Sequence, residues 1–549
     1  MSTWRGRVVA LVAGTPLALA FPAPALWWLA LVGLVPVLLL ARAAGDAREA
    51  AVRAWLSGTG FFLAVNAFLV PKVGPFMVPL AMLLAALWLP LGWLAWRLLG
   101  AGPPARPLRL GAALVLLPSA FVAGEAVRSW EGLGGPWGLL GASQWNAPPL
   151  LGVAAVGGVW AVSLLLVAVN VAAAAALAPG VAPRVRAAAT TVAVALPLLA
   201  LAWWALRPPP PAAGTVRVGL VQPGIVRQVE PRFQASERLS LDLAAGRPAA
   251  AADLVVWGES SVGRDPGANP GDVARLAAVA RAVGAPVLAN VDAQRGAGGG
   301  IYKSALLVAP GGPVGGYDKM RLVPFGEYVP LRPLLGWVTR FTDAADTDRR
   351  RGTRLAVLPV EGAGEPQGGA PVDRPEGAGE PQGGAPVHRP EGAGAFTVGP
   401  LICFESAFPD LARNLAAAGA DLVVVQTADT TFQRSWGPAQ HASLAAVRAV
   451  EAGRPVVQVA ISGVSAAFDA RGRRLAWRPT SVRGATVVEL PLSRERTPYG
   501  RGGDWLPVGA ALVLAAGALV ALGRRRSTAG QGGATLPKEV RASPRPRDP

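Results

Sequence analysis

The sequence contains one cysteine and two histidines among 549 residues. Cys403 has no partner for an intramolecular disulfide, and a zinc site made of several cysteines is excluded. His388 and His441 provide little material for a metal site or a histidine base. His388 also lies in a low-complexity repeat, so chemistry of the serine-hydrolase type would depend on His441 alone.

Acidic residues are nearly absent from residues 1–206. That stretch contains only Asp46, Glu49, Glu125 and Glu131. Over the whole chain 52% of residues are hydrophobic and 16% are charged, whereas about a quarter are charged in a typical soluble domain. The chain is therefore a membrane half joined to a polar half that begins near Thr215. A single soluble domain and a wholly disordered chain are both excluded.

The net charge is +18, and a basic surface is often the footprint of nucleic-acid binding. Many of these arginines, however, fall in short loops between apolar runs, where positive charge orients membrane helices. Others fall in the tail, 523–549. No basic segment is interleaved with aromatic residues as a single-strand binder requires. We expect no nucleic-acid partner.

Apolar runs predict about eight membrane spans, each near the 20 residues that cross about 30 Å of hydrocarbon. They are 7–21, 22–41, 52–71, 75–97, 108–127, 148–177, 186–206 and 505–522. The first is short and ends at Phe21-Pro22. A signal peptide is the alternative there, but no polar mature region follows it.

Arginines occupy alternate loops between these spans. They are Arg5 and Arg7; Arg42, Arg48 and Arg53; Arg97, Arg106 and Arg109; Arg184 and Arg186; and Arg524, Arg525 and Arg526. The loops between them carry almost no positive charge. The positive-inside rule then places both termini in the cytoplasm and residues 215–494 on the outer face.

Charged residues are almost absent within the spans, whereas a pump or transporter usually keeps some along its pathway. Only Glu125 and Arg128, near the outer end of the fifth span, come close. They are either a local ion pair or a functional one. The membrane part resembles an anchor or a platform for lipids.

The outer domain, 215–494, follows a proline-rich linker, 207–214. Apolar runs predict buried strands at Val216–Gln222, Asp253–Trp257, Pro286–Asn290, Ser304–Ala309, Phe396–Ile402, Leu422–Gln426, Val456–Ile461 and Ala485–Leu490. Helical periodicity occurs at Asp272–Val283, Asp410–Ala418 and Gln440–Ala452. Apolar strands separated by helices favour an α/β domain with its sheet covered by helices.

A repeat interrupts this domain. Glu361–Pro375 reads EGAGEPQGGAPVDRP, Glu376–Pro390 repeats it with His388 in place of Asp373, and a third copy stops by residue 395. This composition predicts a disordered surface insertion at 361–395, which argues against a catalytic His388. The tail, 523–549, is expected to be disordered in the cytoplasm.

Three reactive residues stand out. Glu259 and Cys403 each follow a predicted strand, where enzymes often place catalytic groups, and Lys319 lies in a polar loop. A thiol is mostly protonated at neutral pH and needs a base or a cation. Glu259 would accept its proton, and Lys319 would stabilise the thiolate and an oxyanion. A buried structural cysteine and solvated loop charges are the alternative.

Three blocks around these residues resemble the catalytic blocks of the nitrilase superfamily, in particular its membrane branch, the apolipoprotein N-acyltransferases. They are Trp257-Gly-Glu-Ser, Tyr317-Asp-Lys-Met-Arg-Leu-Val-Pro-Phe-Gly-Glu-Tyr-Val-Pro and Leu401-Ile-Cys-Phe-Glu-Ser. The segments Gly437-Pro-Ala-Gln-His, Arg448-Ala-Val-Glu-Ala-Gly-Arg-Pro and Gly135-Pro-Trp-Gly-Leu-Leu-Gly-Ala-Ser-Gln are also similar to that family. The resemblance covers nearly the whole chain except the repeat and the tail.

The resemblance implies a role for five residues. Glu259 is the general base, Lys319 the oxyanion-stabilising cation and Cys403 the acylated nucleophile. Glu327 and Glu405 support the site. It also implies an extracytoplasmic αββα sandwich on eight membrane helices, in the cell membrane of a bacterium, with no metal or nucleotide cofactor. We expect a monomer. His441 is expected to form structural hydrogen bonds rather than to act as a base.

The chain departs from the family pattern at two places. Gly258 stands where proline is usual. The family's Ser-Asn-Asp-Ala-Trp-Phe-Gly stretch appears as Thr427-Ala-Asp-Thr-Thr-Phe-Gln, so Asp429 and Phe432 are retained while the Asn and the Trp are lost. Acceptor preference or efficiency is therefore where we expect a difference.

The leading hypothesis is an enzyme that moves an acyl chain from a phospholipid onto Cys403. The chain then passes to the N-terminal α-amine of a diacylglyceryl-modified lipoprotein. Both substrates carry chains that resist leaving lipid, at about 0.8 kcal/mol per CH₂. The alternatives are a membrane-tethered amidase that uses water as acceptor, and an inert scaffold or transporter.

Overall fold

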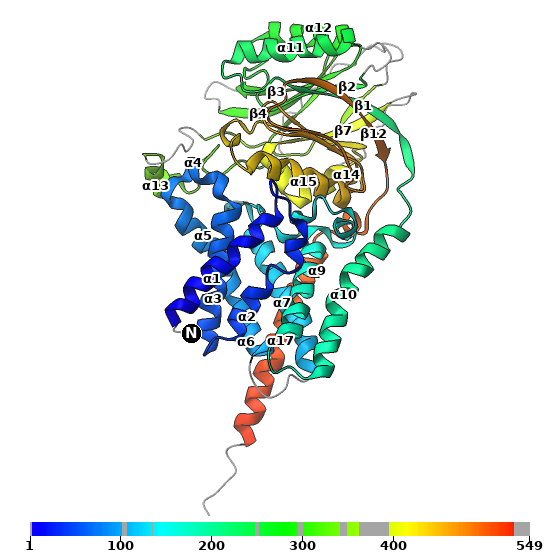
Figure 1. Cartoon of the computed structure of the whole chain (residues 1–549). Coiled ribbons are helices and arrows are strands. Elements are labelled where there is room, and N and C mark those ends of the chain that lie inside the picture. The colour runs from blue at the N-terminus through cyan, green and yellow to red at the C-terminus, as the bar shows by residue number, and fades with distance from the viewer. Residues whose placement is uncertain are drawn as a thin grey trace, which may run out of the picture.

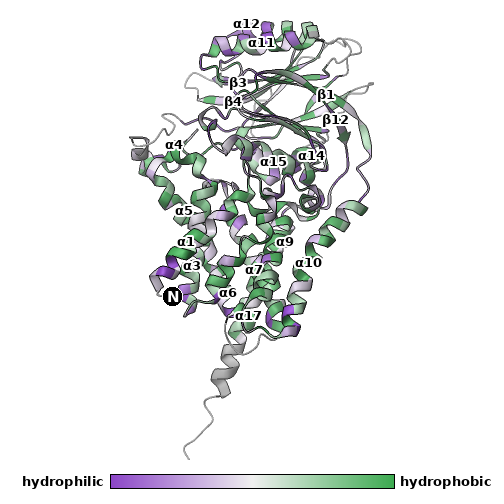
Figure 2. Ribbon diagram, viewed as in Figure 1, coloured by the Kyte–Doolittle hydropathy of each residue, from purple (hydrophilic) through white to green (hydrophobic). Residues whose placement is uncertain are grey.

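The computed structural model describes residues 3–100, 107–133, 135–246, 252–294, 300–340, 348–361 and 395–531. An apolar helical domain lies beneath an α/β domain, and the C-terminal helix returns through the helical domain (Figure 1). Hydropathy follows this division, because hydrophobic residues dominate the lower helices whereas the outermost helices of the α/β domain are more polar (Figure 2). The predicted combination of a helical domain and an α/β domain is confirmed.

The helical domain consists of long helices joined by short helical turns. The longer helices are α1 (Thr3–Gly14), α2 (Val35–Arg42), α3 (Ala47–Val65), α5 (Met77–Ala85), α6 (Leu89–Leu99), α7 (Pro107–Arg128), α9 (Ala154–Leu177), α10 (Pro183–Leu206) and α17 (Trp505–Gln531). The short ones are α4 (Val70–Val73) and α8 (Pro148–Leu151). Gly157 and Gly158 break α9 near its start, with φ +69° at Gly158.

Five helical segments in the described residues are long and apolar enough to cross a membrane. They are Ala67–Leu99, Leu108–Arg128, Ala154–Leu177, Pro183–Leu206 and Trp505–Gly523. They coincide with five of the eight predicted spans. Of the other three, 7–21 and 22–41 are divided among shorter helices and 3₁₀ turns, whereas 52–71 contains most of the continuous helix α3 followed by a 3₁₀ turn, Ala67–Leu69. The count of eight spans therefore stays a prediction.

Two six-stranded sheets stack to form the α/β domain. The first has the order β12 (Gly484–Ser493), β1 (Ala212–Gln222), β2 (Leu254–Trp257), β3 (Val287–Gln294), β4 (Ile301–Ala309) and β5 (Gly312–Asp318). The second has the order β11 (Arg474–Arg478), β10 (Ser465–Phe468), β9 (Val456–Ala460), β8 (Leu422–Thr427), β7 (Phe396–Ile402) and β6 (Leu358–Val360). In each sheet the three central strands β1–β2–β3 and β7–β8–β9 are parallel.

Helices cover both outer faces, which gives the αββα order. Helices α11 (Val229–Gly246) and α12 (Pro270–Val283) cover the first sheet, while α14 (Pro409–Ala417) and α15 (Gly437–Ala452) lie between the second sheet and the helical domain (Figure 1). Apolar side chains such as Val218 and Leu220 of β1 share the core between the sheets with Val424 of β8. Both faces of the central strands are buried, so the sequences of these strands are unbroken apolar runs.

All eight predicted strands are present, with ends shifted by a few residues. The sequence analysis missed β5, β6, β10 and β11, which are short, glycine-rich or partly exposed, and it also missed α11. The first strand begins at Ala212, inside the predicted linker, because Ala212 pairs with Ser493 of β12. The strands that enter and leave the α/β domain are thus neighbours. The repeat at 362–394 and the end of the tail lie outside the described residues.

Candidate active site

The three reactive residues converge from three strand ends. Glu259 follows β2 of the first sheet, Lys319 follows β5 of the same sheet, and Cys403 follows β7 of the second. The Lys319 Nζ atom lies 3.4 Å from the Glu259 Oε1 atom. The Cys403 thiol interacts electrostatically with both side chains. The structure therefore brings together the residues that the sequence singled out from positions 144 residues apart in the chain (403 − 259).

Lys319 is the most deeply buried charge of this cluster, with 1% of its surface exposed. Its Nζ atom also donates to the Glu327 Oε1 atom at 2.9 Å. Burial alone would lower the pKa of Lys319, but Glu259, Glu327 and Cys403 outweigh it and hold the pKa well above its usual value. Lys319 is therefore a fixed cation between two carboxylates.

Cys403 is half-buried at the first position of a 3₁₀ turn, Cys403–Ala407. Its φ angle is +55°, a left-handed conformation that non-glycine residues seldom adopt unless their surroundings impose it. Desolvation and Glu259 raise the pKa of the thiol well above its usual value, against the opposing effect of Lys319. The resting group is therefore a neutral thiol that needs a base to ionise.

Glu405 is fully buried and connects the turn of Cys403–Ala407 to the loop that follows Lys319, the lysine loop. Its Oε1 atom accepts hydrogen bonds from the Tyr317 hydroxyl at 2.6 Å and the amides of Met320 and Arg321 at 2.7 and 3.0 Å. Its Oε2 atom accepts from the Ile402 amide at 2.8 Å. Burial raises the pKa of Glu405, and these donors oppose that effect. One carboxyl group thus fixes the segments on both sides of the site.

Glu327 anchors the lysine loop in a similar way. While one of its carboxylate oxygens accepts from Lys319, the other accepts from the Val323 amide at 2.8 Å. The loop from Lys319 to Glu327 is therefore closed on itself. This explains locally why glutamate follows lysine at that spacing.

The turn that carries Glu259 requires glycine just before it. A Cβ atom on Gly258 would lie 2.1 Å from the Ile461 backbone nitrogen, so any larger residue must displace the neighbouring backbone. The Glu259 amide donates to the Thr427 carbonyl oxygen at 3.2 Å. Gly258, which stands where proline is usual, therefore lies at a point where the two sheets approach closely. It does not lie in a simple exposed turn.

Two residues of the site were missed by the sequence analysis, Asn290 and Gln426. The Asn290 Oδ1 atom accepts from the Ser260 amide at 2.8 Å, and the Gln426 Nε2 atom donates to the carbonyls of Trp257 and Leu288 at 2.8 and 3.0 Å. Gln426 belongs to the second sheet and its acceptors to the first. Both residues are polar and end an apolar run, the signal that singled out Glu259 and Cys403.

His441 lies on α15 beside Cys403. Its Nδ1 atom is 2.9 Å from the Asp429 Oδ1 atom, and its Nε2 atom is 3.0 Å from the Cys403 carbonyl oxygen. Neither ring nitrogen is directed at the thiol. The expected hydrogen-bonding role of His441 agrees with these contacts. Asp429 and Thr427 both belong to this cluster, and they come from the stretch Thr427–Gln433 that differs from the family pattern. Thr427 also forms a hydrogen bond with the thiol.

The helical domain contacts the site through the segment after α7. Glu131 pairs with Arg321 at 3.3 Å and with Arg351 at 2.6 Å. The indole of Trp137 donates to the Gln440 Oε1 atom at 2.9 Å, and its ring lies 5.7 Å from that of His441. The segment from 131 to 138 therefore reaches both the lysine loop and α15.

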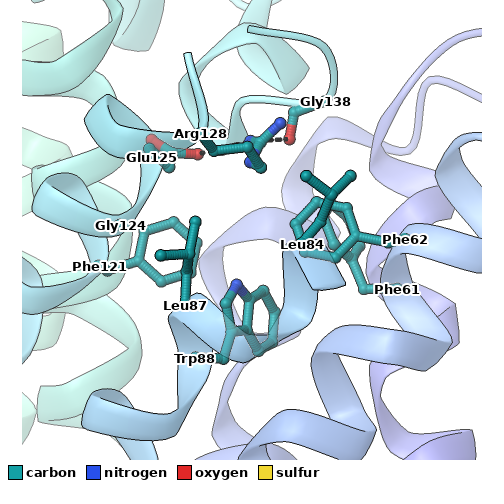
Figure 3. Close-up of a pocket in the computed structure, with 10 residues that line it drawn as sticks. All are labelled: Phe61, Phe62, Leu84, Leu87, Trp88, Phe121, Gly124, Glu125, Arg128 and Gly138. Carbon is teal, nitrogen blue, oxygen red and sulfur yellow. Dashed lines mark hydrogen bonds and ion pairs between the residues drawn. The ribbon is translucent and has the colours of Figure 1, made fainter. Parts of the chain in front are cut away.

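An aromatic pocket lies just below this segment in the helical domain. Phe61, Phe62, Trp88 and Phe121 surround it, while Glu125 and Arg128 close its upper end (Figure 3). The Arg128 guanidinium is 3.9 Å from the Glu125 carboxylate and donates to the carbonyls of Trp137 and Gly138. Glu125 accepts from the Leu140 amide at 2.6 Å. The pair therefore acts locally, by holding the segment that touches the site.

The arrangement is chemically suited to acyl transfer through a thiol. A carboxylate can act as a base, a fixed cation can stabilise an oxyanion, and a half-buried thiol can act as a nucleophile. Across the described ranges, no three His, Cys, Asp or Glu side chains are grouped as a metal site would require.

The chain is similar to known proteins over most of its length. The family model for the apolipoprotein N-acyltransferase N-terminal domain matches residues 13–172, and that for carbon-nitrogen hydrolase matches residues 217–497. Apolipoprotein N-acyltransferase of Azotobacter vinelandii is 32% identical over 95% of this chain and 96% of its own length. That of Pseudomonas syringae pv. tomato is 31% identical over 94% and 97%. The crystal structure of an amidase from Nesterenkonia sp. aligns at 19% identity and TM-score 0.33, over 51% of this chain and 91% of its own. The two family models and the full-length relatives place this chain in the apolipoprotein N-acyltransferase family, as a membrane-associated acyltransferase with a nitrilase-like domain.

Proposed function

We propose that this acyltransferase takes a fatty acyl chain from a phospholipid, holds it as a thioester on Cys403 and passes it to the α-amine of a diacylglyceryl-cysteine at a lipoprotein N-terminus. Homologues named for N-acylation of apolipoproteins support the overall reaction. The observation that carries the proposed route is the half-buried thiol of Cys403 beside Glu259 and Lys319.

In the first half-reaction, Glu259 accepts the proton of the thiol as Sγ attacks the ester carbonyl carbon of the phospholipid. The oxygen of that carbonyl becomes an oxyanion, which the fixed cation Lys319 stabilises. The intermediate collapses when the bond from the carbonyl carbon to the glycerol oxygen breaks. Glu259 returns its proton to that oxygen, so a lysophospholipid leaves and the thioester remains.

In the second half-reaction, the α-amine of the lipoprotein attacks the thioester carbonyl carbon. Glu259 accepts a proton from the amine, and Lys319 again faces the oxyanion. The bond from carbon to sulfur then breaks, an amide forms, and the sulfur of Cys403 recovers its proton from Glu259. Water in place of the amine would release a free fatty acid, which is the amidase outcome.

The site is expected to lie on the extracytoplasmic side of the membrane, because arginines occupy alternate loops and the expected number of spans is even. A reporter fused after Ala213 should behave as extracytoplasmic, and one fused after Arg526 as cytoplasmic. Both reporters on the same side would overturn the eight-span topology without affecting the chemistry.

Mass spectrometry of a native lipoprotein N-terminus tests the reaction as a whole. In cells with the intact protein, the N-terminal cysteine should carry two ester-linked chains and one amide-linked chain. In cells that depend on the Cys403→Ala variant, the amide-linked chain should be missing and the α-amine free. An amide-linked chain at normal level in those cells would contradict the proposed function.

A further inference from the structure

The His441 ring contacts Cys403, Asp429, Thr427 and Trp137. The Nε2 atom faces the Cys403 carbonyl oxygen at 3.0 Å, and Nδ1 faces Asp429 Oδ1 at 2.9 Å and the Thr427 hydroxyl at 3.3 Å. The ring is 3% exposed. Trp137 of the helical domain packs against it at 5.7 Å between ring centres. His441 is therefore held by polar or packing contacts on each of these sides.

Both ring nitrogens face oxygens that accept hydrogen bonds. A carboxylate and a backbone carbonyl have no hydrogen to donate, so each is satisfied only if the ring nitrogen opposite it carries one. Burial alone would lower the pKa of His441, but Asp429 and the Cys403 carbonyl outweigh it and raise the pKa. The ring donates in two directions, and its bond to Cys403 is assisted by charge.

The accepting carbonyl belongs to the residue with the unusual backbone. Cys403 has φ +55°, at the point where β7 ends and the 3₁₀ turn begins. Such a conformation persists only where neighbours fix it. Glu405 fixes the amide of Ile402 on one side at 2.8 Å, and His441 fixes the carbonyl of Cys403 on the other.

We propose that His441 is a positioning residue that holds the turn of Cys403 by donating a hydrogen bond from Nε2 to the Cys403 carbonyl, while Asp429 orients the ring. The catalytic meaning rests on the proposed function, in which Cys403 is the nucleophile. The contact with Trp137 ties this turn to the helical domain, so the direction of the thiol depends on how the two domains are seated.

Two substitutions separate this role from simple packing. His441→Gln places an amide nitrogen near the position of Nε2, so the donor to the Cys403 carbonyl is kept. His441→Asn places an amide near the position of Nδ1, so the contact with Asp429 is kept and the donor to Cys403 is lost. The variants differ by one methylene, and both lack the ring.

Two readouts follow the thiol directly. Cys403 is the only cysteine of the chain, so alkylation of the detergent-solubilised protein by iodoacetamide reports on that thiol without any acyl donor. Single-turnover acylation from mixed micelles of phosphatidylethanolamine and phosphatidylglycerol reports on catalysis. We expect His441→Asn to slow both by about ten- to a hundredfold, the effect of losing one charge-assisted hydrogen bond. We expect His441→Gln to stay within about threefold of the original protein, and KM for phospholipid to change little in either variant.

Equal rates in the two variants, whether both fast or both slow, would overturn the proposal. If His441→Asn does not fold, as judged by thermal denaturation, His441→Gln decides alone, and a loss above tenfold in the folded variant overturns it. Failure of the proposed function would give a different result, namely an acyl adduct that still forms in Cys403→Ala. Alkylation detects the position of the thiol even in that case.

Discussion

Buried charges serve different purposes in the two domains. In the α/β domain Lys319 lies between Glu259 and Glu327, so two carboxylates share one cation beside a thiol. In the helical domain Glu125 and Arg128 form a single pair that also bonds to the backbone of Trp137, Gly138 and Leu140, and the Arg128 guanidinium lies 5.0 Å from the centre of the Phe62 ring. The first cluster has one more carboxylate than cations, and its members pair through side chains. The second has one carboxylate and one cation, and it holds the backbone near Trp137 and Gly138.

The difference shows that burial of a charge does not by itself mark a reactive site. A balanced pair bonded to backbone amides and carbonyls fixes the chain around it, although the Glu125 Oε2 atom is buried without a hydrogen-bond partner among the described residues. A cluster with an excess carboxylate next to a thiol keeps a group that can accept a proton. Removing the cation should therefore lower the rate in the first cluster, besides any stability lost by leaving Glu259 and Glu327 unpaired, whereas it should act mainly on stability in the second.

The largest effect is expected for Lys319→Met. The change removes the cation that we propose stabilises the oxyanion, and acylation of Cys403 should fall by about 10²–10³. Single-turnover formation of the acyl-enzyme measures it. Arg275→Met is the matched control, because Arg275 is also a paired cation of the α/β domain, 2.6 Å from Glu237 on the outer helices. Its activity should be unchanged. Acylation at the original rate in Lys319→Met would remove the distinction between the clusters.

Arg128→Leu should act in the opposite manner. Glu125 would remain buried without its partner, which typically costs about 3–5 kcal/mol of stability. Thermal denaturation in detergent should show this loss, while acylation per folded molecule falls far less than in Lys319→Met. The double variant Glu125→Gln with Arg128→Leu removes both charges and should recover part of the stability. Unchanged stability in Arg128→Leu would mean that the pair does not hold the segment it touches.

Sequence patterns predicted the α/β domain more fully than the helical one. Apolar runs such as Phe396–Ile402 coincide with strands because those strands are buried on both faces. In the helical domain the first two predicted spans are divided into short helices and 3₁₀ turns, and hydropathy averaged over 20 residues does not register such breaks. The strands missed, such as β5 and β11, lie at sheet edges where burial is partial.

Sequence reasoning singled out Glu259, Lys319 and Cys403, which the structure brings together, because each has a reactive side chain within a short recognisable block. It missed residues whose role depends on a contact across the fold. In the sequence Gln426 is only the last residue of a predicted apolar strand. The structure shows that its amide donates to carbonyls of the other sheet. Likewise, the contact of Trp137 with His441 joins residues 304 positions apart (441 − 137), and no local pattern encodes such a distance.

The smallest effect is expected for deletion of residues 361–390. Val360 of β6 pairs directly with Phe396 of β7, so residues 391–395 are enough to connect the two strands as a hairpin loop of usual length. Thermal stability and acylation should stay near those of the full chain. A clear loss of either would mean that the repeat packs against the domain or binds a substrate.

The central claim is tested most directly by the mass of the protein after incubation with phospholipid in the absence of an amine acceptor. The intact chain should gain one acyl chain, held as a thioester that hydroxylamine removes, and the adduct should persist rather than release a free fatty acid. Cys403→Ala should gain nothing, because the chain has no second thiol. An acyl adduct that still forms in Cys403→Ala would contradict the account.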